Sequence, residues 1–238
     1  MKMNSYIFLG SAFLVLSLFL KLITPLDIYI LKFLNSLMFS EFFFSYFTEI
    51  GNGLICLAVI APILSYVSHK SNLNSIKIQT LVFTCIGVGL IVKVVKELTS
   101  VFAMRPAYYK FTDVTFLEPI FLYSSFPSGH AAIILSISFV WIFLAFKKIE
   151  FRFKTLMIYS LLSFALLVSL SRVIVAAHWL SDVLGSIALA FFMLKIIQLK
   201  VFKNLLYESE FAKYFSFFLI GLSWLYLLTT RTLYLDGY

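Results

Sequence analysis

The sequence predicts an all-α protein that crosses a membrane several times. Of its 238 residues, 62% are hydrophobic and only 13% are charged, and the mean hydropathy is +1.01. Soluble domains average about 45–50% apolar and about 25% charged residues, so a water-soluble fold is excluded. Apolar runs long enough to cross a bilayer recur along the whole chain. We therefore expect one integral membrane domain over residues 1–238, with no separate soluble domain.

Six apolar runs predict six transmembrane helices, and a further run follows near the C-terminus. The six lie at about 6–24, 53–68, 79–95, 131–146, 156–172 and 179–199, and the further run lies at about 211–229. The last run could form a seventh helix. We interpret the first run as a span and not as a cleaved signal peptide, because no small-residue cleavage pattern follows it. The aromatic-rich stretch 26–50 predicts an interfacial segment.

The charges of the loops predict their sides of the membrane. Loops 68–78 and 147–154 are basic. Because basic residues gather in cytoplasmic loops, we place these loops and the N-terminus in the cytoplasm. Loops 25–52 and 97–127 carry more acidic than basic residues and are expected outside. Lys21, near the far end of the first run, departs from this pattern, although a lysine at the end of a span can snorkel. The net charge of +8 then requires no nucleic-acid partner.

Three polar clusters interrupt the apolar sequence, and the predicted topology places all of them outside. They are Arg105-Pro106 after the third run, Pro127-Ser128-Gly129-His130 before the fourth, and Ser171-Arg172 with His178 and Asp182 around the junction of the fifth and sixth. We expect these clusters to share one site.

The residue types suit a phosphate group. Ser128 can cap the following helix, and Gly129 lets backbone N–H groups approach a ligand. A helix N-terminus binds anions, and guanidinium groups such as those of Arg105 and Arg172 hold phosphate oxygens in pairs. An isolated serine is more often an ordinary helix cap, and a lone boundary arginine is usually an interfacial anchor. Basic residues are uncommon in extracytoplasmic loops, so the presence of two arginines on that side needs another explanation.

Two histidines could carry the chemistry. His178 and Asp182 are four residues apart and share one helix face. The carboxylate can fix one imidazole nitrogen and leave the other as a nucleophile or base. A structural polar pair is the alternative. His130 supplies a second imidazole that could protonate a leaving oxygen.

These motifs resemble those of the type 2 phosphatidic acid phosphatase (PAP2) superfamily. Residues 127–130 match its P-S-G-H motif, and the pattern from Ser171 to Asp182 matches its S-R-x5-H-x3-D motif. The resemblance covers about residues 96–182. Within the superfamily, the chain is similar to the bacterial branch that contains lipid A 1-phosphatases and undecaprenyl diphosphatases.

The resemblance implies a six-helix, metal-free lipid phosphatase with no cofactor. His178 would form a phosphohistidine, Asp182 would orient it, and His130 would protonate the leaving oxygen. Phosphate oxygens would be bound by Arg105, Arg172, Ser128 and Gly129. The same resemblance implies the bacterial inner membrane, with a periplasmic active site. The partners it implies are the bilayer and a lipid phosphate, with no obligate protein partner.

The first motif of the family departs from its usual spacing. The family has lysine seven positions before the arginine of Arg-Pro, and this chain has Leu98 there. Lys96 can bind phosphate only if its helix ends before Arg105, because positions nine apart lie on opposite faces of a continuous helix. We expect Lys96 to bind phosphate, with Lys93 as the alternative.

Two other functions fit parts of the sequence. Two histidines and an aspartate could bind a divalent metal, but this leaves both arginines unexplained. A transporter would place ionisable residues or broken helices near the bilayer midplane. Here the ionisable residues gather at the ends of the spans, and Pro62 is the main helix-breaking residue within one.

Overall fold

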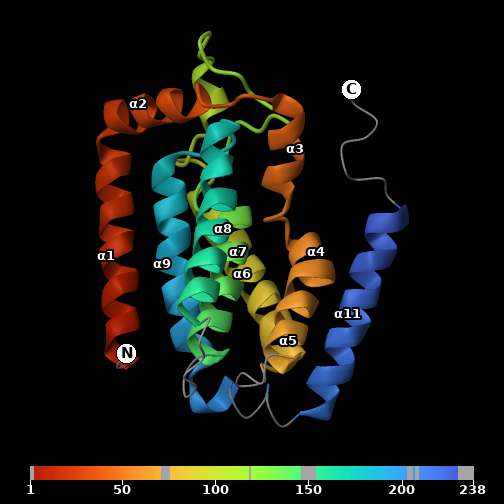
Figure 1. Cartoon of the computed structure of the whole chain (residues 1–238). Helices are drawn as coiled ribbons and strands as arrows, with labels where there is room; N and C mark the ends of the chain where they lie inside the picture. The colour runs from red at the N-terminus through yellow and green to blue at the C-terminus, as the bar shows by residue number, and fades with distance from the viewer. Residues whose placement is uncertain are drawn as a thin grey trace.

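The fold is a bundle of helices that run roughly parallel or antiparallel (Figure 1). The computed structural model describes residues 3–70, 76–117, 119–145, 154–202, 206 and 209–229. Its helices are α1 (Met3–Leu22), α2 (Thr24–Asn35), α3 (Glu41–Glu49), α4 (Gly53–Ile55), the π-helix η1 (Cys56–Ile60), α5 (Ala61–Lys70), α6 (Ile78–Thr99), the 3-10 helix η2 (Pro106–Tyr109), α7 (Gly129–Ala145), α8 (Lys154–Ile174), α9 (Leu180–Ile197) and α11 (Glu210–Thr229). The predicted loop 147–154 lies, except for Lys154, outside the described residues.

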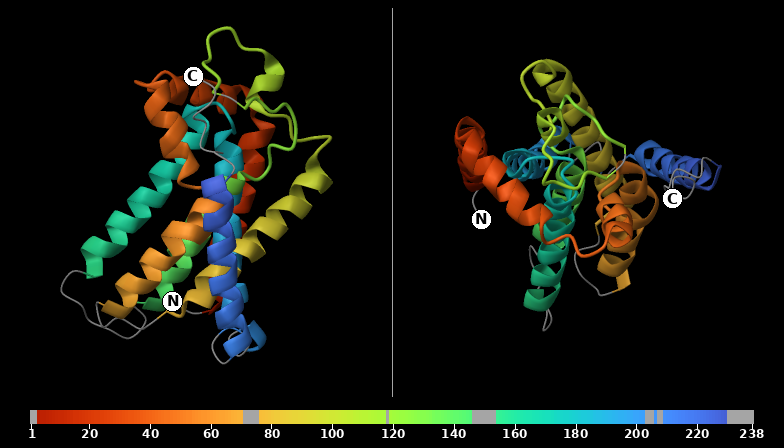
Figure 2. Two further views of the ribbon diagram at one scale, coloured as in Figure 1. Left: turned by 90° about the vertical axis from the view of Figure 1, so that its right-hand side faces the viewer. Right: turned by 90° about the horizontal axis from the view of Figure 1, so that it is seen from above.

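The predicted fold class is confirmed. Within the described ranges, six segments are long and apolar enough to cross a membrane: Ser5–Leu22, Gly53–Lys70, Ile78–Thr99, Lys154–Ile174, Leu180–Ile197 and Glu210–Thr229. The C-terminal apolar run therefore forms a helix of spanning length, α11. α7 is also apolar, but its 17 residues extend only about 25 Å at 1.5 Å per residue. Seen from above, α1 and α11 lie on opposite flanks of the bundle (Figure 2).

α7 is the central helix. Apolar residues cover all of its faces, as expected for a helix that other helices surround. It packs against α6, α8 and α9. The indole Nε1 of Trp141 donates to the carbonyl of Leu64 at 2.6 Å, which joins α7 to α5. The polar motif at residues 127–130 therefore lies at the start of a helix that other helices surround.

The second span contains a widened turn just before Pro62. Proline lacks an N–H group, and its ring clashes with the carbonyl four residues earlier in a regular α-helix. The π-helical turn η1 (Cys56–Ile60) precedes Pro62 and accommodates it within the span. The residue that sequence analysis singled out as a helix breaker therefore widens one turn, and the helix continues as α5.

α2 lies across one end of the bundle, and α3 turns back toward its interior (Figure 1). The buried side chain of Asn35 fixes the end of α2. Its amide donates to the carbonyls of Ile174 at 2.7 Å and Thr115 at 2.8 Å, and it accepts from the N–H of Thr115 at 2.9 Å. Ser40 then caps α3 by accepting from Phe43 N at 3.2 Å. These contacts hold α3 beside the polar end of α8.

Candidate active site

The three polar clusters meet at the same end of the bundle, as predicted. The N–H groups of Ala177 and His178 both donate to the carbonyl of Arg172, at 3.1 and 3.0 Å. The guanidinium of Arg105 donates to the carbonyl of Ala177 at 3.1 Å and to that of Tyr123 at 3.0 Å. Two arginines and His178 are therefore joined through one short segment of backbone.

Asp182 is a buried hub at the start of α9. It occupies the third helical position, where its carboxylate accepts from the N–H of Trp179 at 3.1 Å and favours the positive end of the helix dipole. Oδ2 also accepts from the hydroxyl of Ser125 and lies 3.4 Å from Nδ1 of His178. Oδ1 pairs with Nζ of Lys21 at 2.8 Å. Every oxygen of this carboxylate has a partner.

The ammonium of Lys21 has a partner within the polar cluster, which the sequence analysis did not predict. Its side chain is 29% exposed and its ammonium binds Asp182, 161 positions away in the sequence. The ammonium also lies 5.2 Å from the ring centre of Phe126. A fully buried carboxylate is costly without a counter-charge, and Lys21 at the end of α1 supplies it.

His178 is held as a neutral imidazole. Its side chain is only 2% exposed. Burial lowers the pKa of His178 well below its usual value, and the nearby Arg105 adds to this effect, although Asp182 opposes it. Because Nδ1 faces the Asp182 carboxylate, Nδ1 carries the proton and Nε2 keeps its lone pair. This is the form that a nucleophile requires.

Acidification should destabilise the protein through His178. In the unfolded chain this histidine takes up a proton near pH 6.5, whereas in the folded chain it stays neutral to much lower pH. Its contribution to stability is therefore complete above about pH 6.5 and falls below it, by at most about 1.4 kcal/mol per pH unit. Thermal unfolding in detergent at several pH values measures this. His178→Gln should flatten the profile, and an unchanged profile would contradict the assignment.

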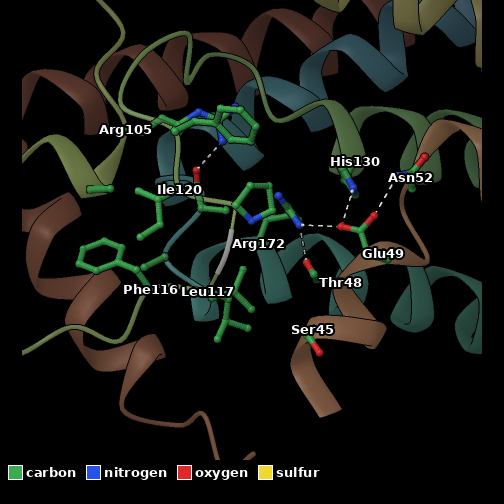
Figure 3. Close-up of a pocket in the computed structure, with 16 residues that line it drawn as sticks. Ser45, Thr48, Glu49, Asn52, Arg105, Phe116, Leu117, Ile120, His130 and Arg172 are labelled. Atoms are coloured by element: carbon green, nitrogen blue, oxygen red, sulfur yellow. Dashed lines mark hydrogen bonds and ion pairs between the residues drawn. The ribbon is translucent and has the colours of Figure 1, made fainter. Parts of the chain in front are cut away.

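A second carboxylate, that of Glu49, lies beside the other histidine (Figure 3). Oε1 of Glu49 is 3.3 Å from Nε2 of His130 and 3.8 Å from a terminal nitrogen of Arg172. Oε2 accepts from the amide of Asn52 at 2.8 Å. The same nitrogen of Arg172 donates to the hydroxyl of Thr48 at 2.8 Å. Burial alone would raise the pKa of Glu49, but His130, Asn52 and Arg172 outweigh it and lower the pKa to about 2.

Gly51 permits this arrangement. A Cβ atom built on Gly51 would lie 2.9 Å from Cβ of His130 and 3.0 Å from its carbonyl oxygen. Real Cβ atoms do not approach so closely, so the turn between α3 and α4 can touch the start of α7 only with glycine at this position. The close approach brings Glu49 within reach of His130.

A cavity of about 210 Å³ opens beside these groups. Its polar lining includes Ser45, Thr48, Glu49, Asn52, Arg105, His130 and Arg172, and its apolar lining includes Phe116, Leu117, Pro119, Ile120 and Phe121. Ala177 lines the cavity, but His178, Ser128 and Gly129 do not. The side chain of the candidate nucleophile, His178, is buried next to this cavity segment and is 2% exposed.

The side chain of Ser128 does not cap α7, which corrects the sequence prediction. Its hydroxyl is buried and has no hydrogen-bond partner among the described residues. The backbone of Ser128 is instead tied to α9, because its carbonyl accepts from the hydroxyl of Ser186 at 2.9 Å. The hydroxyl remains available to a phosphate oxygen, so its predicted binding role stays a prediction. Gly129 begins α7 and is half-buried.

The helix that carries Lys96 ends before Arg105, as a phosphate-binding role for this lysine requires. α6 ends at Thr99, and the chain then turns back, since the N–H of Arg105 donates to the carbonyl of Leu122 at 2.9 Å. Lys96 comes within electrostatic range of both histidines and both arginines of the site. Lys93 is exposed. The geometry therefore favours Lys96 as the lysine of the site.

Sequence reasoning missed several residues of this cluster. Glu49 entered the prediction only through the charge of loop 25–52, and Lys21 only as a basic residue at the end of the first run. Asn52 and Ser125 were not considered. One signal was available: Glu49 and Asn52 stand directly before the second span, on the side where the three motifs were predicted to lie. No signal in the sequence pairs Lys21 with Asp182.

Comparison with known families decides the identity of the fold. The PAP2 superfamily model matches residues 78–206, more than half of the chain and all of its motif residues. The chain belongs to the PAP2 superfamily. A protein of known structure, Aquifex aeolicus LpxE, has a similar fold, with a TM-score of 0.53 and 22% sequence identity. The match covers 72% of this chain and 93% of that one. No curated protein matches the chain.

The predicted family and the predicted membrane fold are thus confirmed, and together they support a membrane phosphatase. The PAP2 match begins at residue 78. Lys21 and Glu49, which contact the motif residues Asp182 and His130, lie before it. The N-terminal helices of this PAP2 protein therefore contribute charged groups to a site whose motifs come from the matched region.

Proposed function

We propose that the protein removes a phosphate group from a membrane lipid through a phosphohistidine on His178. The observation that carries this proposal is the joint placement of a neutral, carboxylate-bound His178 and two arginines on one backbone segment. A neutral imidazole can attack phosphorus, and guanidinium groups can stabilise the negative charge that develops on the phosphoryl oxygens. No step requires a metal ion.

The proposed reaction uses the two imidazoles in two steps. Nε2 of His178 forms a bond to phosphorus while the bond to the leaving oxygen breaks, and His130 gives that oxygen a proton. Water then attacks phosphorus and gives a proton to His130 as the phosphorus–nitrogen bond breaks. Inorganic phosphate leaves, and both histidines return to their starting forms. Arg105, Arg172 and Lys96 hold the phosphoryl oxygens, with Ser128 and the Gly129 N–H as further donors.

The lining of the cavity supports a lipid substrate. Both charged groups and the apolar residues of 116–121 line it, which suits a phosphate next to a hydrocarbon or other apolar group. We propose the 1-phosphate of lipid A as the substrate, following the branch that the motifs resemble. Undecaprenyl diphosphate and phosphatidylglycerol phosphate are the alternatives.

A panel assay tests the proposed activity. Purified protein in detergent is given lipid A, undecaprenyl diphosphate, phosphatidylglycerol phosphate and phosphatidic acid, and released phosphate is measured with and without chelator. We expect release that persists in chelator and stops with vanadate, with one lipid preferred by its kcat/KM. No release from any lipid would refute the proposal, and loss of activity in chelator would refute the metal-free mechanism.

The site should face the periplasm of a bacterial inner membrane. This follows from the basic residues at the opposite end, which include Lys70, Lys77 and Lys154. Cysteine placed at Tyr123, which is exposed at the site end, should react with a membrane-impermeant thiol reagent in intact cells. Cysteine at His69, exposed at the other end, should react only after lysis. The two native cysteines are buried and give little background. The reverse labelling pattern would overturn the orientation.

A further inference from the structure

The two histidines of the site differ in how their carboxylate partners are held. Asp182, beside His178, shares its charge with the ammonium of Lys21 and also accepts from Ser125 and Trp179. Glu49, beside His130, accepts from the neutral amide of Asn52, and its Oε1 lies 3.8 Å from Nη1 of Arg172. The carboxylate of Asp182 is thus paired directly with a lysine, whereas the charged groups nearest to the carboxylate of Glu49 are His130 and, further away, Arg172.

We propose that Glu49 is a positioning residue that orients His130 toward the leaving oxygen and stabilises the positive charge of its protonated form. The proposal rests on the proposed phosphatase reaction and adds to it a residue from outside the PAP2 match. Its structural basis is the approach of Oε1 of Glu49 to Nε2 of His130, at 3.3 Å. His130 must hold a proton before it can give one to the leaving group.

The charges around His130 show why it needs such a partner. From α8, Arg172 lies close to it, and from α6, Lys96 acts on it at longer range. Both are cations, and both oppose a positive charge on the imidazole. From α3, Glu49 provides the opposing negative charge among the described residues that face His130. Without this carboxylate, the described charges that act on His130 would all be cations, and its protonated form would be less stable.

The position of Glu49 is well fixed. Its side chain is 12% exposed, and Asn52, one turn further along the chain, binds the oxygen that does not face His130. Gly51 holds the segment against the backbone of His130. Thr48 accepts from Arg172 and from Ser171, which attaches the last turn of α3 to α8. A group built in this way can hold an imidazole in one orientation.

The opposite interpretation makes a different prediction. Oε1 of Glu49 lies near both His130 and Arg172, where an oxygen of the phosphate could also bind. If the carboxylate merely occupied that place, it would compete with the substrate. Removal of its charge would then strengthen phosphate binding and raise kcat/KM. Removal of a positioning residue must instead lower kcat.

The test compares leaving groups in Glu49→Gln. The full chain in detergent is assayed with 4-nitrophenyl phosphate, whose leaving group departs without a proton, and with dodecyl phosphate in mixed micelles, whose alkoxide needs one. We expect kcat for dodecyl phosphate to fall about 10- to 100-fold. This loss is a part of the rate enhancement that general acid catalysis usually provides. For 4-nitrophenyl phosphate we expect a change below about threefold. The alkaline limb of the pH profile for dodecyl phosphate should move to lower pH.

Two variants control this experiment. Glu41→Gln makes the same substitution in the exposed first turn of α3 and should match the wild type. Glu49→Asp keeps the charge on a shorter side chain and should show a smaller loss with the same dependence on the leaving group. The Asp variant also serves if the Gln variant fails to fold. In a His130→Ala background, Glu49→Gln should have no additional effect, because it acts through that imidazole.

The outcomes separate this inference from the proposed function. Equal losses for both leaving groups, a wild-type rate, or a higher kcat/KM in Glu49→Gln would each overturn the role of Glu49 while the wild type stays an active phosphatase. An inactive wild type, or an active His178→Ala protein, would instead refute the proposed function, and the role of Glu49 with it.

Discussion

His178→Ala should lose phosphate release by at least about 10⁴-fold, because it removes the atom that would attack phosphorus. The fold should survive. Asp182 keeps the hydroxyl of Ser125, the N–H of Trp179 and the ammonium of Lys21 as partners, so no buried charge is left alone. The measurement is phosphate release from the preferred lipid by purified protein, with thermal unfolding in detergent as the test of folding.

The matched control is His69→Ala, an exposed histidine at the other end of the bundle, which should keep full activity. Mass spectrometry after a rapid alkaline quench should find phosphate bound to His178 in the wild type and none in His178→Ala. Turnover near the wild-type level in the folded His178→Ala protein would show that another group attacks phosphorus.

The sequence was sufficient to predict the parts of the molecule that depend on local composition. Runs of apolar residues predicted the spans, including α11, because a helix that crosses hydrocarbon must be apolar along its length. Loop charges and short motifs predicted that Arg105, His130 and His178 lie at one end. The prediction of the spans uses only residues that are near each other in the chain. The prediction of a shared end uses short motifs and the side of the membrane on which each loop lies.

What the sequence could not predict are the contacts between distant helices. Lys21 meets Asp182 because α1 packs along α9, and Glu49 meets His130 because the turn after α3 touches the start of α7. Hydropathy predicts which segments cross the membrane, but it does not predict which helix faces contact one another. The hydroxyl of Ser128 shows a similar limit, since its preference for capping a helix gives way to packing against α9.

Asp182→Asn should lower kcat by about 10⁴-fold, the usual effect of removing the charge that orients a catalytic histidine. Asparagine has nearly the same size and can still accept from the N–H of Trp179, so the start of α9 should remain formed. It cannot fix the same tautomer of His178, nor stabilise positive charge on the imidazole as phosphorus binds. Steady-state kinetics on the preferred lipid measure the loss, and Asp113→Asn, an exposed aspartate paired with Lys32, should retain full activity.

A second effect distinguishes catalysis from stability in this variant. Asp182→Asn leaves the ammonium of Lys21 without its counter-charge, and because Lys21 is partly exposed the cost should be modest, about 1 kcal/mol. Lys21→Met combined with Asp182→Asn removes the unpaired charge and should restore the melting temperature while activity stays lost. If the double variant regained activity together with stability, Asp182 would act by holding the bundle together, and its proposed role in orienting His178 would be wrong.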